Sequence, residues 1–213
     1  MRLPNGGQID RSRKLSFTFD GQRFEGHPGD TLASALLAND QILMARSFKY
    51  HRPRGALTAG SEEPNALVTL GRGARQEPNA RATTVELVEG LEARGQNAWP
   101  SVRFDVLGMN DLFAPFFGAG FYYKTFMWPR AFWEKLYEPA IRRAAGLGAL
   151  SGEHNTDAYE KVQAFCDLLI IGAGPTGLMA ALTAARAGAQ VILCDEDVKM
   201  GGRLNAETFE IAG

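Results

Sequence analysis

The chain has 213 residues, of which 45% are hydrophobic and 22% charged, and its net charge is −1 with an isoelectric point near 6.3. This composition is typical of a soluble globular protein with room for one large or two small domains. The near-neutral charge gives no reason to expect nucleic acid or an anionic membrane as a partner. No apolar run approaches transmembrane length and the N-terminus lacks a signal-peptide core, so we expect a cytoplasmic location.

The first 98 residues predict a polar arm followed by a small mixed domain. Residues 1–13 form the arm, and residues 14–98 form an α+β domain of the β-grasp type. The domain opens with alternating apolar residues and a hairpin turn, which are Leu15, Phe17, Phe19 and Asp20-Gly21. A helix then runs from Leu32 to Asn39 with Asp30 or Thr31 as its N-cap. Further strands are predicted at 66–70 and 83–88, and this order of elements matches plant-type ferredoxins.

Residues 99–164 form an aromatic-rich connecting segment. Eleven of the 21 aromatic residues lie between Phe113 and Tyr137, where glycines, prolines and basic residues exclude a membrane helix. A helix is predicted from Trp128-Pro129, with a kink at Pro139 and an end near Gly146. The aromatic side chains have two interpretations, a core that packs two domains together and a docking surface for another subunit.

Residues 165–213 predict the first βαβ unit of an NAD- or FAD-binding Rossmann domain, an α/β fold. An apolar strand at 168–171 enters the sequence Gly172-Ala-Gly174-Pro-Thr-Gly177, which precedes a helix and a second strand at 191–194. Gly172 permits the turn, Gly174 lets the backbone approach a pyrophosphate, and Gly177 allows close helix packing. The helix N-terminus then faces the phosphates.

Asp195 ends the second predicted strand, where a carboxylate accepts hydrogen bonds from the ribose hydroxyls of an adenine dinucleotide. The same charge would repel a 2′-phosphate, so NADP is disfavoured. Glycine-rich loops also arise as ordinary turns, but here the strands, the helix and the acid are in register. Only eleven residues follow Gly202, so the sheet is incomplete. Either the chain is part of a longer polypeptide, which we prefer, or a separate chain supplies the missing strands.

The sequence predicts no metal site and no catalytic residue. The two cysteines, Cys166 and Cys194, are expected about 15 Å apart on neighbouring strands, too far for a disulfide, and both are interpreted as buried structural thiols. The basic cluster at 49–54 either holds a phosphate or partner carboxylate or is a solvated or interface loop. We assign no role to His27 and His154.

Three features in this order resemble a known family. They are the stretch Ser47-Phe48-Lys49-Tyr50-His51-Arg52-Pro53-Arg54-Gly55, the stretch from Asn110 to Lys124 that reads NDLFAPFFGAGFYYK, and the glycine triplet. Together they resemble the N-terminal part of the α subunits of heterotetrameric sarcosine oxidases, over essentially the whole chain. The α-type subunits of amine and opine dehydrogenases and of hydrogen cyanide synthase are more distant relatives with the same layout.

The resemblance implies a flavoenzyme that oxidises sarcosine with O2 to glycine and H2O2, and that passes the one-carbon unit to tetrahydrofolate as 5,10-methylenetetrahydrofolate. It implies β, γ and δ subunits as partners, NAD bound to this chain, and FMN and FAD in the assembled enzyme. The 213 residues alone are then expected to be inactive. Carried over to this sequence, the cofactor-binding residues are Gly172, Gly174, Thr176, Gly177, Asp195, Glu196 and Arg203.

Some members of the wider family carry a [2Fe–2S] cluster in the β-grasp domain, ligated from the loop after the Arg-Pro-Arg-Gly segment. Here that loop reads ALTAGSEE over residues 56–63 and contains no cysteine. We therefore expect a cluster-free, structural domain. Two other hypotheses remain open, a subunit of an FAD-dependent opine or amine dehydrogenase and a non-catalytic nucleotide-binding scaffold.

Overall fold

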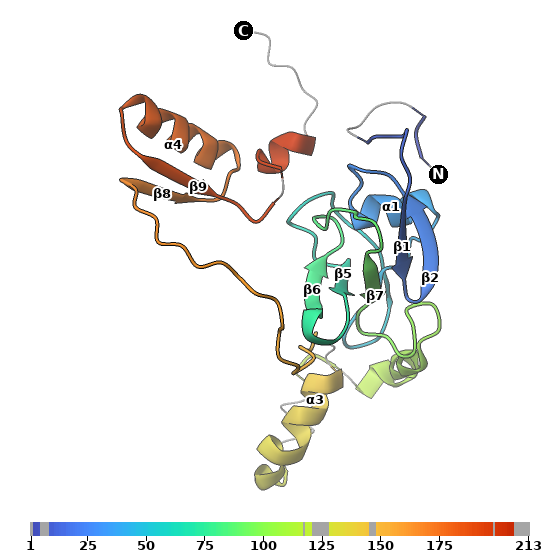
Figure 1. Ribbon diagram of the computed structural model, residues 1–213. Helices are drawn as coiled ribbons and strands as arrows, with labels where there is room; N and C mark the ends of the chain where they lie inside the picture. The colour runs from blue at the N-terminus through green and yellow to red at the C-terminus, as the bar shows by residue number, and fades with distance from the viewer. Residues whose placement is uncertain are drawn as a thin grey trace. The chain divides into compact units, whose positions relative to one another are not determined.

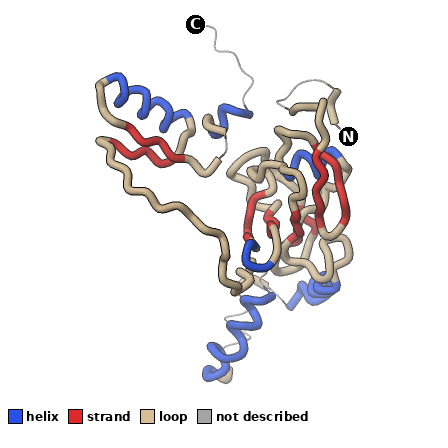
Figure 2. Tube along the Cα trace, in the orientation of Figure 1, coloured by secondary structure: helices blue, strands red, loops and turns tan. Residues whose placement is uncertain are grey.

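The computed structural model describes residues 2–4, 9–116, 118–120, 128–144, 148–197 and 199–206. Its contacts divide the chain into two compact units, an N-terminal unit of Met1–Asn155 and a C-terminal unit of Thr156–Gly213 (Figure 1). Residues 148–167 contain no helix or strand (Figure 2). Both helices and strands are present, as the sequence predicted.

A five-stranded sheet in the order β2-β1-β7-β5-β6 forms the N-terminal unit. Strands β1 and β2 pair antiparallel, β1 and β7 parallel, and β5 pairs antiparallel with both β7 and β6. A separate short pair joins β3 and β4. The strands are β1 Leu15–Phe19, β2 Gln22–Gly26, β3 Ala45–Arg46, β4 Pro53–Arg54, β5 Leu67–Leu70, β6 Glu77–Arg81 and β7 Glu92–Gly95.

The predicted hairpin is confirmed. Asp20 and Gly21 join β1 to β2 with φ values of 49° and 79°, the pair of positive values that a two-residue hairpin turn requires. The Asp20 carboxylate also accepts the N–H groups of Gly95 at 2.9 Å and Val102 at 3.0 Å. The turn therefore ties the first hairpin to the end of β7 and the chain beyond it.

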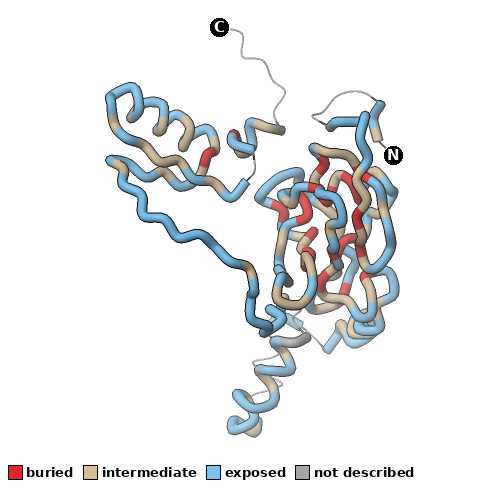
Figure 3. Tube along the Cα trace, viewed as in Figure 1, coloured by how far each residue is buried: buried red, intermediate tan, exposed pale blue. Residues whose placement is uncertain are grey.

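Helix α1, Leu32–Ala38, is also confirmed, with Thr31 as the N-cap and a reciprocal capping box with Ser34. Its apolar face joins one core with the inward side chains of the sheet, and Figure 3 shows the buried positions gathered in this unit. The fully buried members of this core include Phe17, Phe19, Leu32, Leu36, Met44, Val68, Leu87 and Val102.

The strand predicted at 83–88 is wrong. Residues 82–85 form a turn, and Glu86 makes only an isolated bridge with Thr31. The structure instead contains β6, which the sequence did not predict because Pro78 and Asn79 have low strand propensity. Proline is tolerated there because β6 is an edge strand.

Parts of the aromatic-rich segment are helical, and several of its large apolar side chains lie on the surface. A 3-10 helix spans Val106–Phe116, and a 3-10 turn at Arg130–Phe132, a π-helical turn at Trp133–Tyr137 and α3, Glu138–Ala144, follow one another. Pro139 is the second residue of α3 and follows the π-helical turn directly. The predicted end near Gly146 and residues 121–127 lie outside the described residues.

Several large side chains of this segment are exposed, including Leu112 at 75%, Phe116 at 78% and Trp128 at 83%. Both interpretations of the segment, a core between two domains and a docking surface for another subunit, stay predictions. The sequence shows that these side chains are apolar. It does not show whether they are buried, because burial depends on which other parts of the protein pack against them.

The predicted strand–helix–strand of the C-terminal unit is confirmed. Strand β8, Leu168–Ile171, runs parallel to β9, Val191–Cys194, with helix α4, Pro175–Arg186, between them in sequence. A 3-10 helix follows at Gly202–Ala206. The prediction of buried thiols is wrong, since Cys194 is exposed and Cys166 only partly covered, because the two strands have few neighbours to cover them.

No helix within the described part of the chain is both long and apolar enough to cross a membrane.

A buried ion pair fixes the start of α1. The Asp30 side chain is fully buried. Its carboxylate accepts hydrogen bonds from both terminal guanidinium nitrogens of Arg2 at 2.7 Å, from the hydroxyl of Ser34 at 2.6 Å and from the N–H of His27 at 2.9 Å. Burial raises the pKa of Asp30, but the hydrogen bonds from Arg2, Ser34 and His27 outweigh it and hold the pKa below its usual value.

We expect Asp30→Asn to lower the free energy of unfolding at pH 7 by about 2 kcal/mol, because the neutral amide cannot accept all the hydrogen bonds that the charged carboxylate accepts. The folded pKa is depressed, so this contribution is complete above the unfolded pKa of about 3.9 and is lost as pH falls further. Urea unfolding at pH 7 and pH 3 measures both effects. Glu86→Gln, at an exposed position, should change little, and a deficit for the Asp30 variant that is equal at both pH values would contradict the assignment.

Candidate functional site

The loop between β8 and α4 turns sharply at Gly172. Its φ of +104° suits glycine, and its N–H donates to the Cys194 carbonyl at 2.7 Å. This hydrogen bond continues the β8–β9 ladder one residue beyond the strands. The turn therefore begins at the carboxyl ends of both strands, where open α/β sheets bind ligands.

Gly177 packs α4 against this turn. A Cβ atom built on Gly177 would lie 1.8 Å from the carbonyl oxygen of Gly172 and 3.4 Å from Cγ2 of Ile170. Since no real Cβ contact is that short, any side chain here would push the helix away from the turn. The close packing predicted for Gly177 is therefore present.

Gly174 is the N-cap of α4, with φ of −71° and no side-chain cap, and Pro175 takes the first helical position. The first intrahelical bond runs from the Leu178 N–H to the Gly174 carbonyl at 2.9 Å. The N–H groups of Thr176 and Gly177 precede that bond, at the positive end of the helix dipole. A Cβ on Gly174 would meet no atom within 4 Å, so the approach to this helix end is open.

A second glycine pair lies against the loop. The N–H of Gly201 donates to the Ala173 carbonyl at 2.8 Å, and a Cβ on Gly202 would lie 3.2 Å from Cα of Gly174. Arg203 follows in the 3-10 helix and is exposed. The structure thus brings the sequence Gly201-Gly202 beside the glycine triplet, with Arg203 next in the chain.

Asp195 follows β9 and anchors the loop. Its carboxylate accepts the N–H of Ala173, which is fully buried, and the N–H of Asp197 at 2.7 Å. The Ala173 N–H, followed by that of Asp197, holds the pKa of Asp195 below its usual value. This role was not predicted, because nothing local to Asp195 indicates that the N–H group it accepts lies 22 residues away. Glu196 is exposed beside it.

The basic cluster at 49–54 divides between the surface and the interior. Arg52 is exposed, lies 4.7 Å from the centre of the Tyr50 ring and is 3.6 Å from Asp111. His51 is only 2% exposed, and its Nδ1 lies 2.7 Å from Asp105. The solvated-loop interpretation is therefore wrong for His51, because the turn directs its side chain inward.

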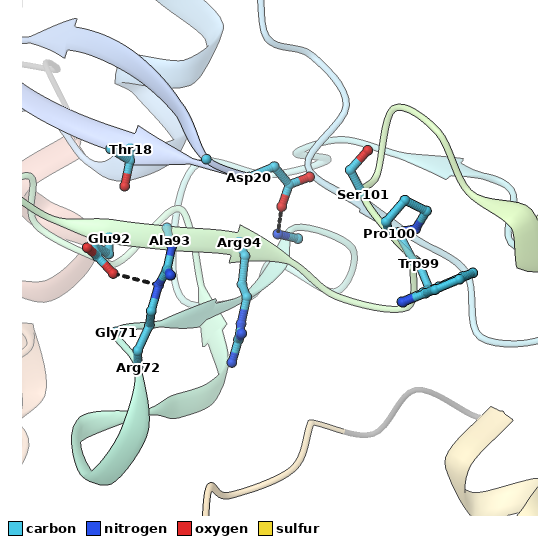
Figure 4. Close-up of a pocket in the computed structure, with 13 residues that line it drawn as sticks. Thr18, Asp20, Gly71, Arg72, Glu92, Ala93, Arg94, Trp99, Pro100 and Ser101 are labelled. Atoms are coloured by element: carbon cyan, nitrogen blue, oxygen red, sulfur yellow. Dashed lines mark hydrogen bonds and ion pairs between the residues drawn. The ribbon is translucent and has the colours of Figure 1, made fainter.

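A cavity of about 480 Å³ opens at the end of β1 and β7 (Figure 4). Two of its charged groups, Arg72 and Glu92, pair with each other at 2.9 Å, and Asp20 accepts backbone N–H groups. It contains none of the predicted cofactor-binding residues. In the described ranges, no group of three or more histidine, cysteine, aspartate or glutamate side chains is arranged to hold a metal ion.

Two family models match separate parts of the chain. Residues 12–98 match the 2Fe-2S iron-sulfur cluster binding domain, and residues 167–210 match the FAD dependent oxidoreductase family. The first match covers a segment without a cysteine. The second covers all the residues predicted to bind a cofactor.

Known proteins resemble the chain along its length. The sarcosine oxidase subunit alpha of Rhizobium meliloti (strain 1021) is 68% identical over 212 residues, which are 100% of this chain and 22% of that protein. The sarcosine oxidase subunit alpha of Corynebacterium sp. (strain U-96) is 33% identical over 96% of this chain and 17% of that protein. A crystal structure of L-proline dehydrogenase from P. horikoshii aligns with a TM-score of 0.44 and 20% identity, over 92% of this chain and 27% of its own.

The chain thus spans about a fifth of the length of the curated relatives that it matches. The match to the Rhizobium protein covers both units. By this likeness the chain belongs to the family of sarcosine oxidase α subunits.

Proposed function

We propose that the C-terminal unit binds an adenine dinucleotide whose pyrophosphate lies at the N-terminus of α4. The observation that carries this proposal is the convergence of two glycine pairs on one helix end, Gly172 and Gly174 from one segment and Gly201 and Gly202 from another. Backbone N–H groups and the helix dipole favour phosphate at such a place. Thr176 and Arg203 would add a hydroxyl and a positive charge beside it.

We propose NAD as the dinucleotide, with its ribose hydroxyls on Asp195 and Glu196. Each carboxylate oxygen has two acceptor positions, so the N–H groups of Ala173 and Asp197 leave capacity on Asp195 for a ribose. FAD is the second candidate, because the family matched by residues 167–210 is that of FAD dependent oxidoreductases. Both molecules contain the adenosine and pyrophosphate that this site would recognise.

We further propose that the chain acts within a multi-subunit sarcosine oxidase. In this proposal the assembly includes β, γ and δ subunits with FMN and FAD, and it converts sarcosine and O2 to glycine and H2O2 while tetrahydrofolate takes the one-carbon unit. The likeness to two sarcosine oxidase α subunits supports it. The part of this chain would be to hold a nucleotide and support assembly, and we assign no catalytic residue to it.

We also propose that the N-terminal unit is a cluster-free β-grasp domain. The parallel pairing of β1 with β7 in the middle of an otherwise antiparallel sheet supports the β-grasp assignment. The absence of cysteine from residues 12–98 supports the cluster-free assignment, since [2Fe–2S] clusters of this class are ligated by cysteine thiolates.

Heat release of cofactors from the natively purified protein, followed by chromatography against NAD, FAD and FMN, tests the identity of the nucleotide. We expect NAD in equimolar amount to this chain, and NADP should not replace it because Asp195 would repel a 2′-phosphate. Release of FAD without NAD would favour the second candidate. A protein that contains neither molecule and binds neither when supplied would contradict the dinucleotide proposal.

Asp195→Ala should weaken NAD binding tenfold to a hundredfold, because hydrogen bonds to a charged group contribute roughly 1.5–3 kcal/mol. Equilibrium dialysis with labelled NAD measures the effect. Asp197→Ala is the matched control, since that exposed carboxylate lies two residues away and only its N–H contacts Asp195. Equal affinity of wild type and the Asp195 variant would disprove the ribose assignment.

Gly174→Ala tests whether phosphate binds at this helix end without changing the stability of the fold. The φ of −71° suits alanine and a Cβ meets nothing within 4 Å, so the thermal midpoint should stay unchanged. Nucleotide affinity should fall by about tenfold or more, because the methyl group would occupy the phosphate approach. Gly177→Ala should by contrast lose both stability and binding, given the 1.8 Å contact. Unaltered affinity in Gly174→Ala would place the phosphates elsewhere.

A further inference from the structure

A buried carboxylate organises the loop between β4 and β5. Glu63 is 2% exposed, and both of its oxygens accept hydrogen bonds from the surrounding chain. Oε2 accepts the N–H of Leu57 at 2.7 Å, the N–H of Thr58 at 2.6 Å and the Thr58 hydroxyl at 3.2 Å. Oε1 accepts the N–H of Asn65 at 2.7 Å and that of Ala66 at 3.0 Å.

This carboxylate is held as an anion by backbone dipoles. Burial raises the pKa of Glu63, but the N–H groups of Thr58, Asn65, Ala66 and Leu57 together lower it below its usual value. Each of these four N–H groups belongs to the loop itself. The loop thus forms a concave set of donors around one negative charge, the arrangement by which backbone nests bind anions.

The positions around Glu63 have the spacing of an iron–sulfur ligand set. Plant-type [2Fe–2S] ligands follow the pattern C-x4-C-x2-C with a fourth cysteine further on, and Thr58, Glu63 and Ala66 have that spacing in this sequence. We place the fourth position at Thr83, because this residue is 4% exposed and donates its hydroxyl to the carbonyl of Gly60 in the same loop at 2.7 Å. All four residues belong to the segment that matches the cluster-binding family.

The chemistry of these four side chains does not fit the cluster. Two hydroxyls, a carboxylate and a methyl group provide no thiolate, and [2Fe–2S] clusters of this class are ligated by thiolates. The backbone N–H groups do fit an anionic group. A carboxylate is one such group, and the sulfurs of a cluster, which also accept hydrogen bonds from the protein, are another. The loop therefore has backbone donors suited to an anion and lacks the thiolates that a cluster requires.

We propose that the Glu63 carboxylate replaces the cluster in this domain, from the second ligand position of the former cluster loop. Its negative charge satisfies the N–H groups that would otherwise face cluster sulfurs. The loop then folds without iron, and the domain serves assembly rather than electron transfer. This inference is independent of the nucleotide site, since every residue involved lies in the N-terminal unit.

The first test replaces the carboxylate by an amide. Glu63→Gln puts an NH2 group against two backbone donors, because both carboxylate oxygens are acceptors. In the natively purified protein, amide hydrogen exchange across residues 57–66 should become roughly tenfold faster or more. Glu62→Gln is the matched control at the neighbouring exposed position and should exchange at the wild-type rate. Unchanged exchange in Glu63→Gln would overturn the proposal.

The second test restores the ligands. The variant Thr58→Cys/Glu63→Cys/Ala66→Cys/Thr83→Cys, reconstituted anaerobically with iron and sulfide, should bind a [2Fe–2S] cluster with visible charge-transfer absorption. The same four positions changed to serine are the control and should bind none. A four-cysteine protein that remains free of iron would overturn the assignment of the ligand positions, and stoichiometric iron in the wild-type protein would overturn the replacement.

A Glu63→Gln protein that fails to fold, while Glu62→Gln folds normally, would also support the proposal, since the loop then depends on the charge. In that case the four-cysteine variant tests whether a bound cluster can take the place of the carboxylate. It lacks the carboxylate as well, so its hydrogen exchange should be fast without iron and slow again once the cluster is bound. Fast exchange that persists with bound iron would contradict the equivalence of carboxylate and cluster.

Discussion

Backbone N–H groups that are removed from water need hydrogen-bond acceptors, and in this protein carboxylates are the acceptors for several of them. A buried donor left without an acceptor costs roughly 1–3 kcal/mol, so a loop with several such donors does not hold its shape unaided. Asp20, Asp30, Glu63, Asp105 and Asp195 each accept one or more backbone N–H groups at a point where the chain changes direction. The first four of these acids determine the path of the loops around the core of the N-terminal unit, and Asp195 does so for the loop before α4.

The same constraint acts in the loop before α4, where we propose the nucleotide site. Asp195 holds Ala173 in place, and Gly201 holds the carbonyl of that same residue. The loop before α4 is therefore fixed from two sides within the protein before any ligand arrives. A site fixed in this way loses less conformational freedom on binding than a mobile loop would.

The two units differ in how completely they bury their apolar residues. Ile170 faces α4, close to Gly177, while its neighbours Leu169 and Ile171 are 54% and 84% exposed. Because side chains alternate along a strand, these two lie on the face that α4 does not cover. An apolar run of this kind is typical of a strand covered on both faces, whereas the N-terminal unit closes a core of its own.

The sequence by itself determined the elements that depend on local chemistry. Alternating residues and Asp20-Gly21 specified the first hairpin, the polar pair Asp30 and Thr31 specified the start of α1, and the glycine triplet specified the turn before α4, since each rests on the geometry of a few consecutive residues. Tertiary structure decided the burial of His51, the edge strand β6 and the hydrogen bond from the Ala173 N–H to Asp195. Those features join residues distant in the chain, and no local preference indicates which distant N–H group a carboxylate will accept.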